Sequence, residues 1–234
     1  MRTLVLQRPQ RRNALIPELS SALLASLNSA MVDSSIRAIV LAAAGPAFCA
    51  GLDLDFARTA TKAELSELVD QQQAIARTIL FGRKPVIAAV HGHAVGGGFE
   101  MALACDVVVW GDTADGWFPE VAKGLVATGG VSALLPLSVG LARAKSMLFF
   151  GERWSGAALQ TSGLVHRVVP SAEVAACAFD LARRLAEQPS DALAFAKRAL
   201  LAGAAGAIRA ALDLETQGAV AGPASAHDNG DAGR

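Results

Sequence analysis

The sequence predicts an α/β fold, because short strand-like runs alternate with longer helix-like stretches. The strand-like runs are rich in β-branched residues, and the stretches between them place apolar side chains at helical spacing. With 234 residues and a mass of 24.0 kDa, the chain can bury a sizeable core without a metal or disulfide staple.

Five short runs are predicted as strands, at residues 3–7, 38–41, 86–90, 107–110 and 164–169. Helices are predicted over residues 17–33 and 62–81, and Thr61 with Glu64 forms a capping box at the start of the second. The segment 91–106 follows a strand and opens a further helix that is apolar almost all round. Strands joined through helices in this way favour a layered protein.

The last third changes character. Residues 171–204 are rich in Ala and Leu and are predicted as two helices divided at Gln188-Pro189-Ser190, with a further short helix over 208–217. The small, polar tail 222–234 is predicted to be frayed or disordered. We therefore divide the chain into a core of residues 1–170 and a helical C-terminal region of residues 171–234.

Composition excludes several classes of protein. The 21 basic residues balance the 21 acidic ones, which argues against a nucleic-acid binder. Three cysteines without a close pair give neither a disulfide framework nor a zinc motif, and they fit a reducing compartment. No signal peptide is visible, and no apolar run reaches the roughly 18 residues of a membrane span. We expect a cytoplasmic protein without a membrane partner.

The strongest chemical signal is the helix start at Gly96, Gly97 and Gly98. Backbone N–H groups there have no intrahelical acceptor, and glycine lets a ligand approach closely, so the site could bind an anion or a developing oxyanion. Glu100 follows in the first turn, as an acid or base beside that site. The alternative is that the glycines serve helix packing and Glu100 caps the helix. Dinucleotide and P-loop glycine patterns are absent.

Residues 47–54, AFCAGLDL, form a second strand-to-helix corner that could offer another backbone donor. Asp53 is interpreted as a helix N-cap, and Cys49 is an unpromising nucleophile because no His is adjacent in sequence. Downstream, Glu120 could pair with Glu100 for general acid–base chemistry, or it could be a surface carboxylate at a helix start.

Two further features carry weaker signals. A basic cluster of Arg2, Arg8, Arg11 and Arg12 could meet phosphates or could be a solvated loop. The pair His91 and His93 has no third ligand nearby in sequence, so we interpret both as turn residues and predict no metal site.

Four stretches, taken together and in this order, resemble the crotonase superfamily of enoyl-CoA hydratases and isomerases. They are LQRPQRRNAL (6–15), GPAFCAGLDL (45–54), KPVIAAVHGHAVGGGFEMALACD (84–106) and FPEVAKGLVATGG (118–130). The resemblance implies a crotonase-like ββα spiral core with a C-terminal helical trimerisation region, as a homotrimer or a dimer of trimers. It also implies an acyl-CoA thioester substrate and no cofactor beyond the CoA of that substrate.

The resemblance assigns roles to four residues. The backbone N–H groups of Leu52 and Gly97 match the oxyanion hole, Glu100 matches the base that activates water, and Glu120 matches the acid that protonates the α-carbon. Isomerases of the family typically keep only the second glutamate. Both are present here, so the resemblance favours hydration of a trans-2-enoyl-CoA to a 3-hydroxyacyl-CoA.

Further positions match the family's substrate-binding segments: Arg11, Asn13, Ala14, Ala50, Asp53, Leu54, Gly98 and Thr128. Among these, Arg11 belongs to the stretch that lines the CoA nucleotide. The loop at 55–62 is where the family usually sets acyl-chain selectivity, and Asp106 matches a structural position. The family usually has one more strand before residues 3–7 and a last helix after the tail, and the resemblance implies that loss of this helix would affect CoA binding and trimer contacts.

Other functions stay open at this point. One is another family reaction, such as isomerisation through Glu120 alone or thioester or carbon–carbon bond chemistry. Another is a non-catalytic acyl-CoA-binding protein, which two retained acids disfavour because burying them costs desolvation free energy. A dinucleotide-dependent oxidoreductase is least favoured, because the chain lacks both the glycine fingerprint and any tyrosine.

Overall fold

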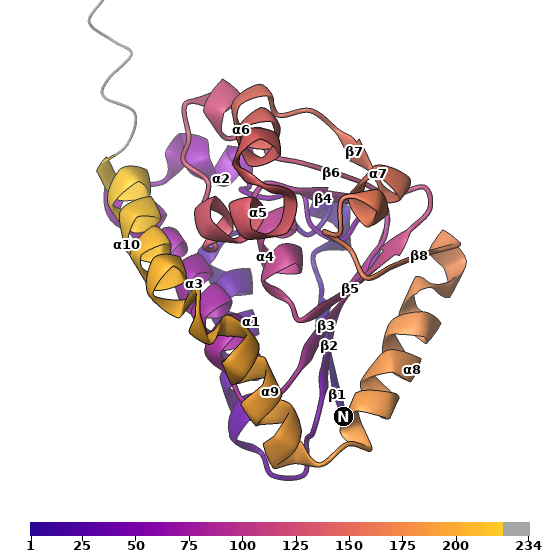
Figure 1. Ribbon diagram of the computed structural model, residues 1–234. Coiled ribbons are helices and arrows are strands. Elements are labelled where there is room, and N and C mark those ends of the chain that lie inside the picture. Colours follow the sequence, from indigo (N-terminus) through magenta and orange to yellow (C-terminus); the bar gives the residue numbers. More distant parts are fainter. Residues whose placement is uncertain (222–234) are drawn as a thin grey trace, which may run out of the picture.

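A five-stranded parallel sheet forms the centre of the computed structural model, which describes residues 1–221 (Figure 1). Its strand order is β1-β2-β3-β5-β8, and every neighbouring pair is parallel. The strands are β1 (Arg2–Leu6), β2 (Ile39–Ala43), β3 (Val86–Val90), β5 (Val107–Gly111) and β8 (Arg167–Val169). A second sheet has the order β4-β6-β7, from β4 (His93–Val95), β6 (Asp115–Trp117) and β7 (Trp154–Ser155).

Helices connect and cover these strands. They are α1 (Pro17–Val32), α2 (Leu54–Thr59), α3 (Lys62–Phe81), α4 (Gly97–Ala104), α5 (Val131–Val139), α6 (Leu141–Phe150), α7 (Gly156–Thr161), α8 (Val174–Ala186), α9 (Ser190–Ala202) and α10 (Ala205–Ala221). The succession β3–β4–α4 is followed by β5–β6–α5, so two strand–strand–helix units follow one another. This is the order that the expected ββα spiral requires.

The large sheet is buried on both faces, which is why its strands are continuous apolar runs. On one face, Ala178 and Leu181 of α8 pack against Val40, Ile87 and Val109. Figure 1 shows α8 on one side of the sheet, while α3, α9 and α10 lie on the other. The C-terminal helices therefore cover both faces of the core.

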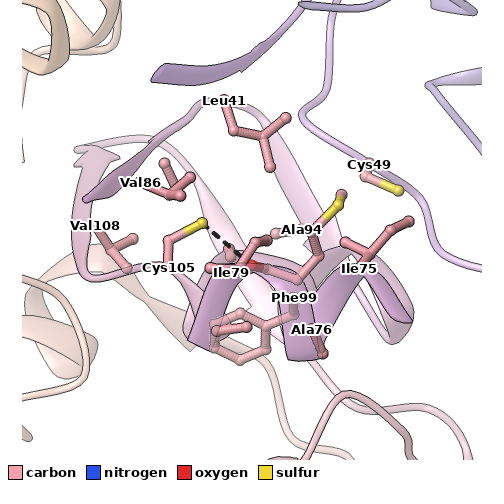
Figure 2. Close-up of a cluster of buried hydrophobic side chains, with 14 of the residues drawn as sticks. Leu41, Cys49, Ile75, Ala76, Ile79, Val86, Ala94, Phe99, Cys105 and Val108 are labelled. Atoms are coloured by element: carbon pink, nitrogen blue, oxygen red, sulfur yellow. Dashed lines mark hydrogen bonds between the residues drawn. The ribbon is translucent and has the colours of Figure 1, made fainter. Parts of the chain in front are cut away.

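The larger core cluster surrounds α4. Figure 2 shows Phe99 of α4 near Ile75 and Ile79 of α3, with Leu41 and Val86 of the sheet beside them. All five side chains are buried. Because α4 is packed on this cluster, its glycine-rich first turn is fixed in position relative to the sheet.

Several predicted elements are confirmed closely. Strand β3 and helix α3 have the predicted bounds, and the helices on either side of Pro189 are present as α8 and α9. The capping box is confirmed, because the Glu64 amide donates to the Thr61 hydroxyl and the Thr61 amide donates to the Glu64 carboxylate. The predicted disordered tail, 222–234, lies outside the described residues.

The structure corrects the prediction in two places. Strand β8 begins at Arg167 rather than at Leu164, because the Leu164 amide still bonds to the Leu159 carbonyl in the turn that ends α7. The second sheet and the helices α5, α6 and α7 were not predicted. Strands of two or three residues, such as Asp-Gly-Trp, are too short to show an alternating pattern.

A buried lysine joins the C-terminal region to the core. The Lys197 ammonium group of α9 donates to the Asp106 carboxylate at 2.7 Å and to the Ile79 and Lys84 carbonyls at 2.6 and 3.1 Å. Asp106 also accepts from the Val86 amide, which supports the structural interpretation of this residue.

Within residues 1–221, no helix has the length and apolar content needed to cross a membrane.

Candidate active site

A cavity of about 140 Å³ lies between α3, α4, α10 and the segment that follows β6. Its lining combines apolar side chains with two carboxylates. The lining residues are Leu15, Leu52, Leu65, Leu68, Val69, Gln72, Gly97, Glu100, Glu120, Gly124, Leu125, Val126, Thr128, Gly218 and Ala219. An apolar pocket with a few convergent polar groups is the usual form of a small-molecule site.

Two free amides lie side by side at one wall of the cavity. Gly97 begins α4, and a Cβ added to Gly51 would lie 3.6 Å from the Gly97 nitrogen, so the two predicted corners meet. Among residues 1–221, no acceptor bonds the amide of Leu52 or that of Gly97. Two unpaired N–H groups in one cavity wall, one of them at the start of a helix, can stabilise an oxygen that becomes negatively charged.

The backbone at Gly96 requires glycine. Its φ of 50° and ψ of −123° are accessible to glycine alone, and an added Cβ would lie 2.1 Å from the Oε1 atom of Glu120. The side chain of Glu120 therefore lies directly against the turn that opens α4. This close approach brings the two predicted corners and the second carboxylate into one site.

Glu100 enters the cavity from the first turn of α4 and is only 3% exposed. Both of its carboxylate oxygens accept hydrogen bonds from Thr128, one from the amide at 2.9 Å and one from the hydroxyl at 2.5 Å. Two donors on one residue fix the plane of the carboxylate. Glu100 is therefore an oriented carboxylate that makes no cap bond to α4.

Glu120 enters the cavity from the segment after β6 and is 8% exposed. Its Oε2 atom is buried and has no hydrogen-bond partner among the described residues. A buried carboxylate oxygen without a partner costs free energy, so its presence points to a function. The interpretation of Glu120 as a surface carboxylate at a helix start is therefore wrong.

The pKa values of both carboxyl groups are raised, which favours the protonated form. Burial is the main cause that raises the pKa of Glu100, the charge of Glu120 raises it further, and the bonds from Thr128 oppose these effects. Burial also raises the pKa of Glu120 above the usual range. Two acids that share one mainly apolar cavity retain a proton more readily than acids in water, which suits proton transfer near neutral pH.

The proposed nucleotide-binding corner is internally paired. Asp53, 4% exposed, caps α2 through the Asp55 and Phe56 amides and accepts from Arg8 and Arg11 at 3.0 and 3.2 Å. Burial opposes ionisation of Asp53, but the bonds from Arg11, the Phe56 amide, Arg8 and the Asp55 amide lower its pKa to about 2. The N-cap prediction for Asp53 is confirmed.

Most of the other predicted substrate-binding residues lie beside the cavity rather than in its lining. Asn13 is buried and bonds the Ala44 and Ala47 carbonyls, and the Ala14 carbonyl accepts from Arg8. The Ala50 amide donates to the Arg12 carbonyl. Leu54 is 47% exposed, and Arg11 bonds Asp55 as well as Asp53.

Gly98 is a packing position. A Cβ added there would lie 2.4 Å from the Cys49 carbonyl oxygen.

Cys49, His91 and His93 do not line the cavity. Cys49 is fully buried, and desolvation raises the pKa of its thiol to about 12, so it is not a nucleophile at neutral pH. His93 bonds Asp115 on the small sheet, and His91 bonds the Gly45 carbonyl. Within residues 1–221, no group of three or more His, Cys, Asp or Glu side chains could hold a metal ion.

Sequence reasoning missed the half of the cavity that faces away from the two corners. The predicted apolar face of α3 supplies Leu65, Leu68 and Val69, but nothing in the sequence distinguishes a side chain that lines a cavity from one that packs in a core. Gly218 and Ala219 of α10 gave no signal at all. The segment expected to be a selectivity loop, 55–62, is mostly helix α2 and does not contribute to the lining.

Comparison with known proteins supports the family resemblance over almost the whole chain. The family model described as enoyl-CoA hydratase/isomerase matches residues 2–229. The 2,3-dehydroadipyl-CoA hydratase of Escherichia coli is 37% identical over 214 residues, which cover 92% of this chain and 83% of that protein.

Solved structures show the same fold. The enoyl-CoA hydratase/isomerase from Pseudoalteromonas atlantica superposes with a TM-score of 0.86 at 30% identity, covering 96% of this chain and 88% of that one. An enoyl-CoA hydratase/isomerase from Mycobacterium paratuberculosis gives a TM-score of 0.89 at 28% identity, covering 96% and 90%. The expected α/β fold is confirmed, and the chain belongs to the enoyl-CoA hydratase/isomerase family of the crotonase superfamily.

Proposed function

We propose that the protein hydrates a trans-2-enoyl-CoA to the 3-hydroxyacyl-CoA. One observation carries the proposal: two buried glutamates from different elements line one apolar cavity, together with two amides that have no acceptor among residues 1–221. A non-catalytic binder has no use for the unpartnered oxygen of Glu120, which costs free energy on folding. Acid–base chemistry on a CoA thioester gives each of these groups a role.

Each of the four residues Leu52, Gly97, Glu100 and Glu120 has a role in the proposed reaction. The thioester oxygen accepts hydrogen bonds from the amides of Leu52 and Gly97, which stabilise the enolate charge. Glu100 removes a proton from a water molecule while the water oxygen bonds to C3 of the substrate. Glu120 delivers a proton to C2 of the substrate. Water is thereby added across the double bond. A proton then passes from Glu100 to Glu120 and restores the starting state.

The cavity lining indicates the class of acyl chain. Among the described residues that line it, no Lys, Arg or His is present, and Gln72 and Thr128 are the only neutral polar side chains. A second carboxylate on the acyl chain would meet apolar walls and the negative charge of Glu100. We therefore infer a hydrocarbon acyl chain, in contrast to the substrate named for the Escherichia coli relative.

For the nucleotide end of CoA, we propose the corner formed by Arg11, Asn13, Ala14 and Asp53. Leu15 and Leu52 form a parallel bridge, so this corner adjoins the cavity wall. The side chain of Arg11 is 43% exposed although its guanidinium group bonds Asp53. Ala50 and Leu54 flank the same wall and would contact the pantetheine part, while Gly98 would act through packing beneath Gly97.

A trimer, or a dimer of trimers, is the proposed assembly. Large apolar side chains are exposed on α5 and α6, namely Leu137, Leu141, Phe149 and Phe150. Several large apolar side chains exposed on two consecutive helices are a feature expected of a subunit contact. Light scattering on the purified protein measures the mass directly.

Double-bond isomerisation is the second candidate reaction. A contrast between the two acids favours it. Both oxygens of Glu100 accept hydrogen bonds from Thr128, whereas the Oε2 atom of Glu120 has no partner among the described residues. That atom could therefore move a proton between two carbons of the substrate. In that case Glu120 alone would suffice. Hydration needs both glutamates.

The loss of the ultraviolet absorbance of the conjugated thioester, with crotonyl-CoA as substrate, tests the proposal. We expect water-dependent loss by the wild-type protein, at least 1000-fold slower in Glu100→Gln and Glu120→Gln because each deletes one proton-transfer group. Glu67→Gln, an exposed acid on α3, is the matched control and should react normally. Normal hydration by Glu100→Gln, or an inert wild type, would contradict the proposal.

A further inference from the structure

A third buried glutamate, Glu215 of α10, lies behind the cavity and is only 4% exposed. Its Oε2 atom accepts from the Gly130 amide at 2.8 Å, and its Oε1 atom accepts from the Ser132 amide at 3.0 Å and the Ser132 hydroxyl at 2.6 Å. The carboxylate therefore holds the start of α5 from a different helix. Glu215 does not line the cavity and takes no direct part in the proposed reaction.

Gln73 of α3 completes the contact. Its side-chain amide donates to Glu215 at 3.3 Å and to the Leu212 carbonyl at 2.9 Å, and its oxygen accepts from the Gly129 amide at 3.0 Å. Gln73 is also buried. It is thus satisfied on both sides and bridges α10 to the segment 128–132.

These bonds fix four backbone amides in one short segment. Thr128 donates to Glu100, Gly129 to Gln73, and Gly130 and Ser132 to Glu215. Without Glu215, the amides of Gly130 and Ser132 would lose their side-chain acceptor, and Gln73 alone would hold the segment beyond Thr128 through a side chain. The position of the proposed base therefore depends on a carboxylate in α10.

We propose that Glu215 is a positioning residue, which aligns Glu100 through the segment 128–132. The inference rests on the proposed function in assigning Glu100 the role of base. It makes α10 a part of the catalytic apparatus, beyond its contribution of Gly218 and Ala219 to the cavity wall. A misplacement of a reacting group by about 1 Å can lower a rate about 100-fold, so the effect on turnover is measurable.

The test is Glu215→Gln. The substituted amide offers one acceptor and one donor where the carboxylate offers two acceptors, so the Gly130 amide or the Ser132 donors lose their partner. We expect kcat for crotonyl-CoA to fall between 10-fold and 100-fold, with KM within threefold of wild type. Ser132→Ala removes a single donor to Glu215, and we expect a kcat loss of about threefold.

Asp213→Asn is the matched control. Asp213 is an acid on the same helix that also bonds α3, through Arg77 at 2.6 Å, but this pair is on the surface. If any loss of contact between α10 and α3 lowered turnover, both variants would do so. We expect Asp213→Asn to keep wild-type kcat, KM and amide exchange.

A second readout does not depend on turnover. Amide hydrogen exchange at residues 128–132 should be at least 10-fold faster in Glu215→Gln, with exchange in α4 unchanged. If the wild type does not hydrate crotonyl-CoA, the proposed function fails while this exchange still decides whether Glu215 orders the segment. Wild-type exchange at Thr128 in Glu215→Gln, or a raised KM with unchanged kcat, would overturn the inference.

Discussion

Thr128 bonds both carboxylate oxygens of Glu100, through its amide at 2.9 Å and its hydroxyl at 2.5 Å. One residue thus orients the proposed base and favours its ionised form, against the burial that raises its pKa. The partner acid, Glu120, has no comparable pair of bonds, and within residues 1–221 its Oε2 atom has no hydrogen-bond partner. The two acids are therefore suited to different roles in spite of their shared cavity.

Thr128→Val tests this relationship, because it removes the hydroxyl donor and keeps the amide and the side-chain shape. Without that donor, burial and Glu120 are opposed less, so the pKa of Glu100 should rise further. A base must be ionised, so the acid limb of the kcat–pH profile should move to higher pH. We expect about a tenfold loss at neutral pH. Thr128→Ser retains the donor, and an unchanged profile in Thr128→Val would show that the bond is unimportant.

Glu120→Gln should stabilise the protein at neutral and alkaline pH. Burial raises the pKa of Glu120 in the folded state, so the contribution of this group to stability declines as pH rises from its unfolded value through its folded value. Glutamine has no such dependence. We expect about 1 kcal/mol, or 2–4 °C in Tm, at pH 8 and no difference near pH 4. A Tm loss that is equal at both pH values would contradict this account.

Asp53→Asn should have the opposite pH dependence. Bonds from Arg11, Arg8 and two amides outweigh burial and lower the pKa of Asp53 to about 2. Its contribution is present above the unfolded pKa near 4 and is lost as pH falls to about 2. Asp53→Asn should therefore cost about 2 kcal/mol at pH 7, measured by urea unfolding, with the difference from wild type shrinking toward pH 2. A constant difference over that range would rule out the ion-pair explanation.

The apolar lining of the cavity predicts substrate discrimination. We expect kcat/KM for 2,3-dehydroadipyl-CoA to be at least 100-fold below that for trans-2-hexenoyl-CoA, which has the same chain length, because burial of its terminal carboxylate costs several kcal/mol without a cation. The two esters can be compared by the same absorbance assay. Equal rates would show that the chain end reaches solvent or a cation outside the lining.

Much of the large sheet and its helices could be predicted from the sequence, because buried parallel strands are apolar runs and α3 carries its own capping box. The small sheet could not, because strands such as Trp-Ser are held by tertiary contacts rather than by local preference. For the site, motif and glycine chemistry indicated Gly97, Glu100 and Glu120, which the structure brings together.

The remaining part of the site depends on contacts far apart in the chain. Glu215 is separated from Ser132 by most of the C-terminal half, and nothing around it in sequence distinguishes it from an exposed helix acid such as Glu67. Conversely, Gly98 looked like a ligand-binding glycine but is required by packing against Cys49. Burial and partner identity, which decide these cases, are properties of the assembled fold.

Isotope incorporation tests the central claim, hydration of an enoyl-CoA, most directly. Purified protein would be incubated with crotonyl-CoA in H₂¹⁸O or in D₂O, and the product would be analysed by mass spectrometry. We predict one ¹⁸O in the 3-hydroxyl group and one deuterium at C2, with both lost in Glu120→Gln. Deuterium exchange into the substrate without incorporation of oxygen would contradict hydration and would leave proton transfer by Glu120 as the reaction.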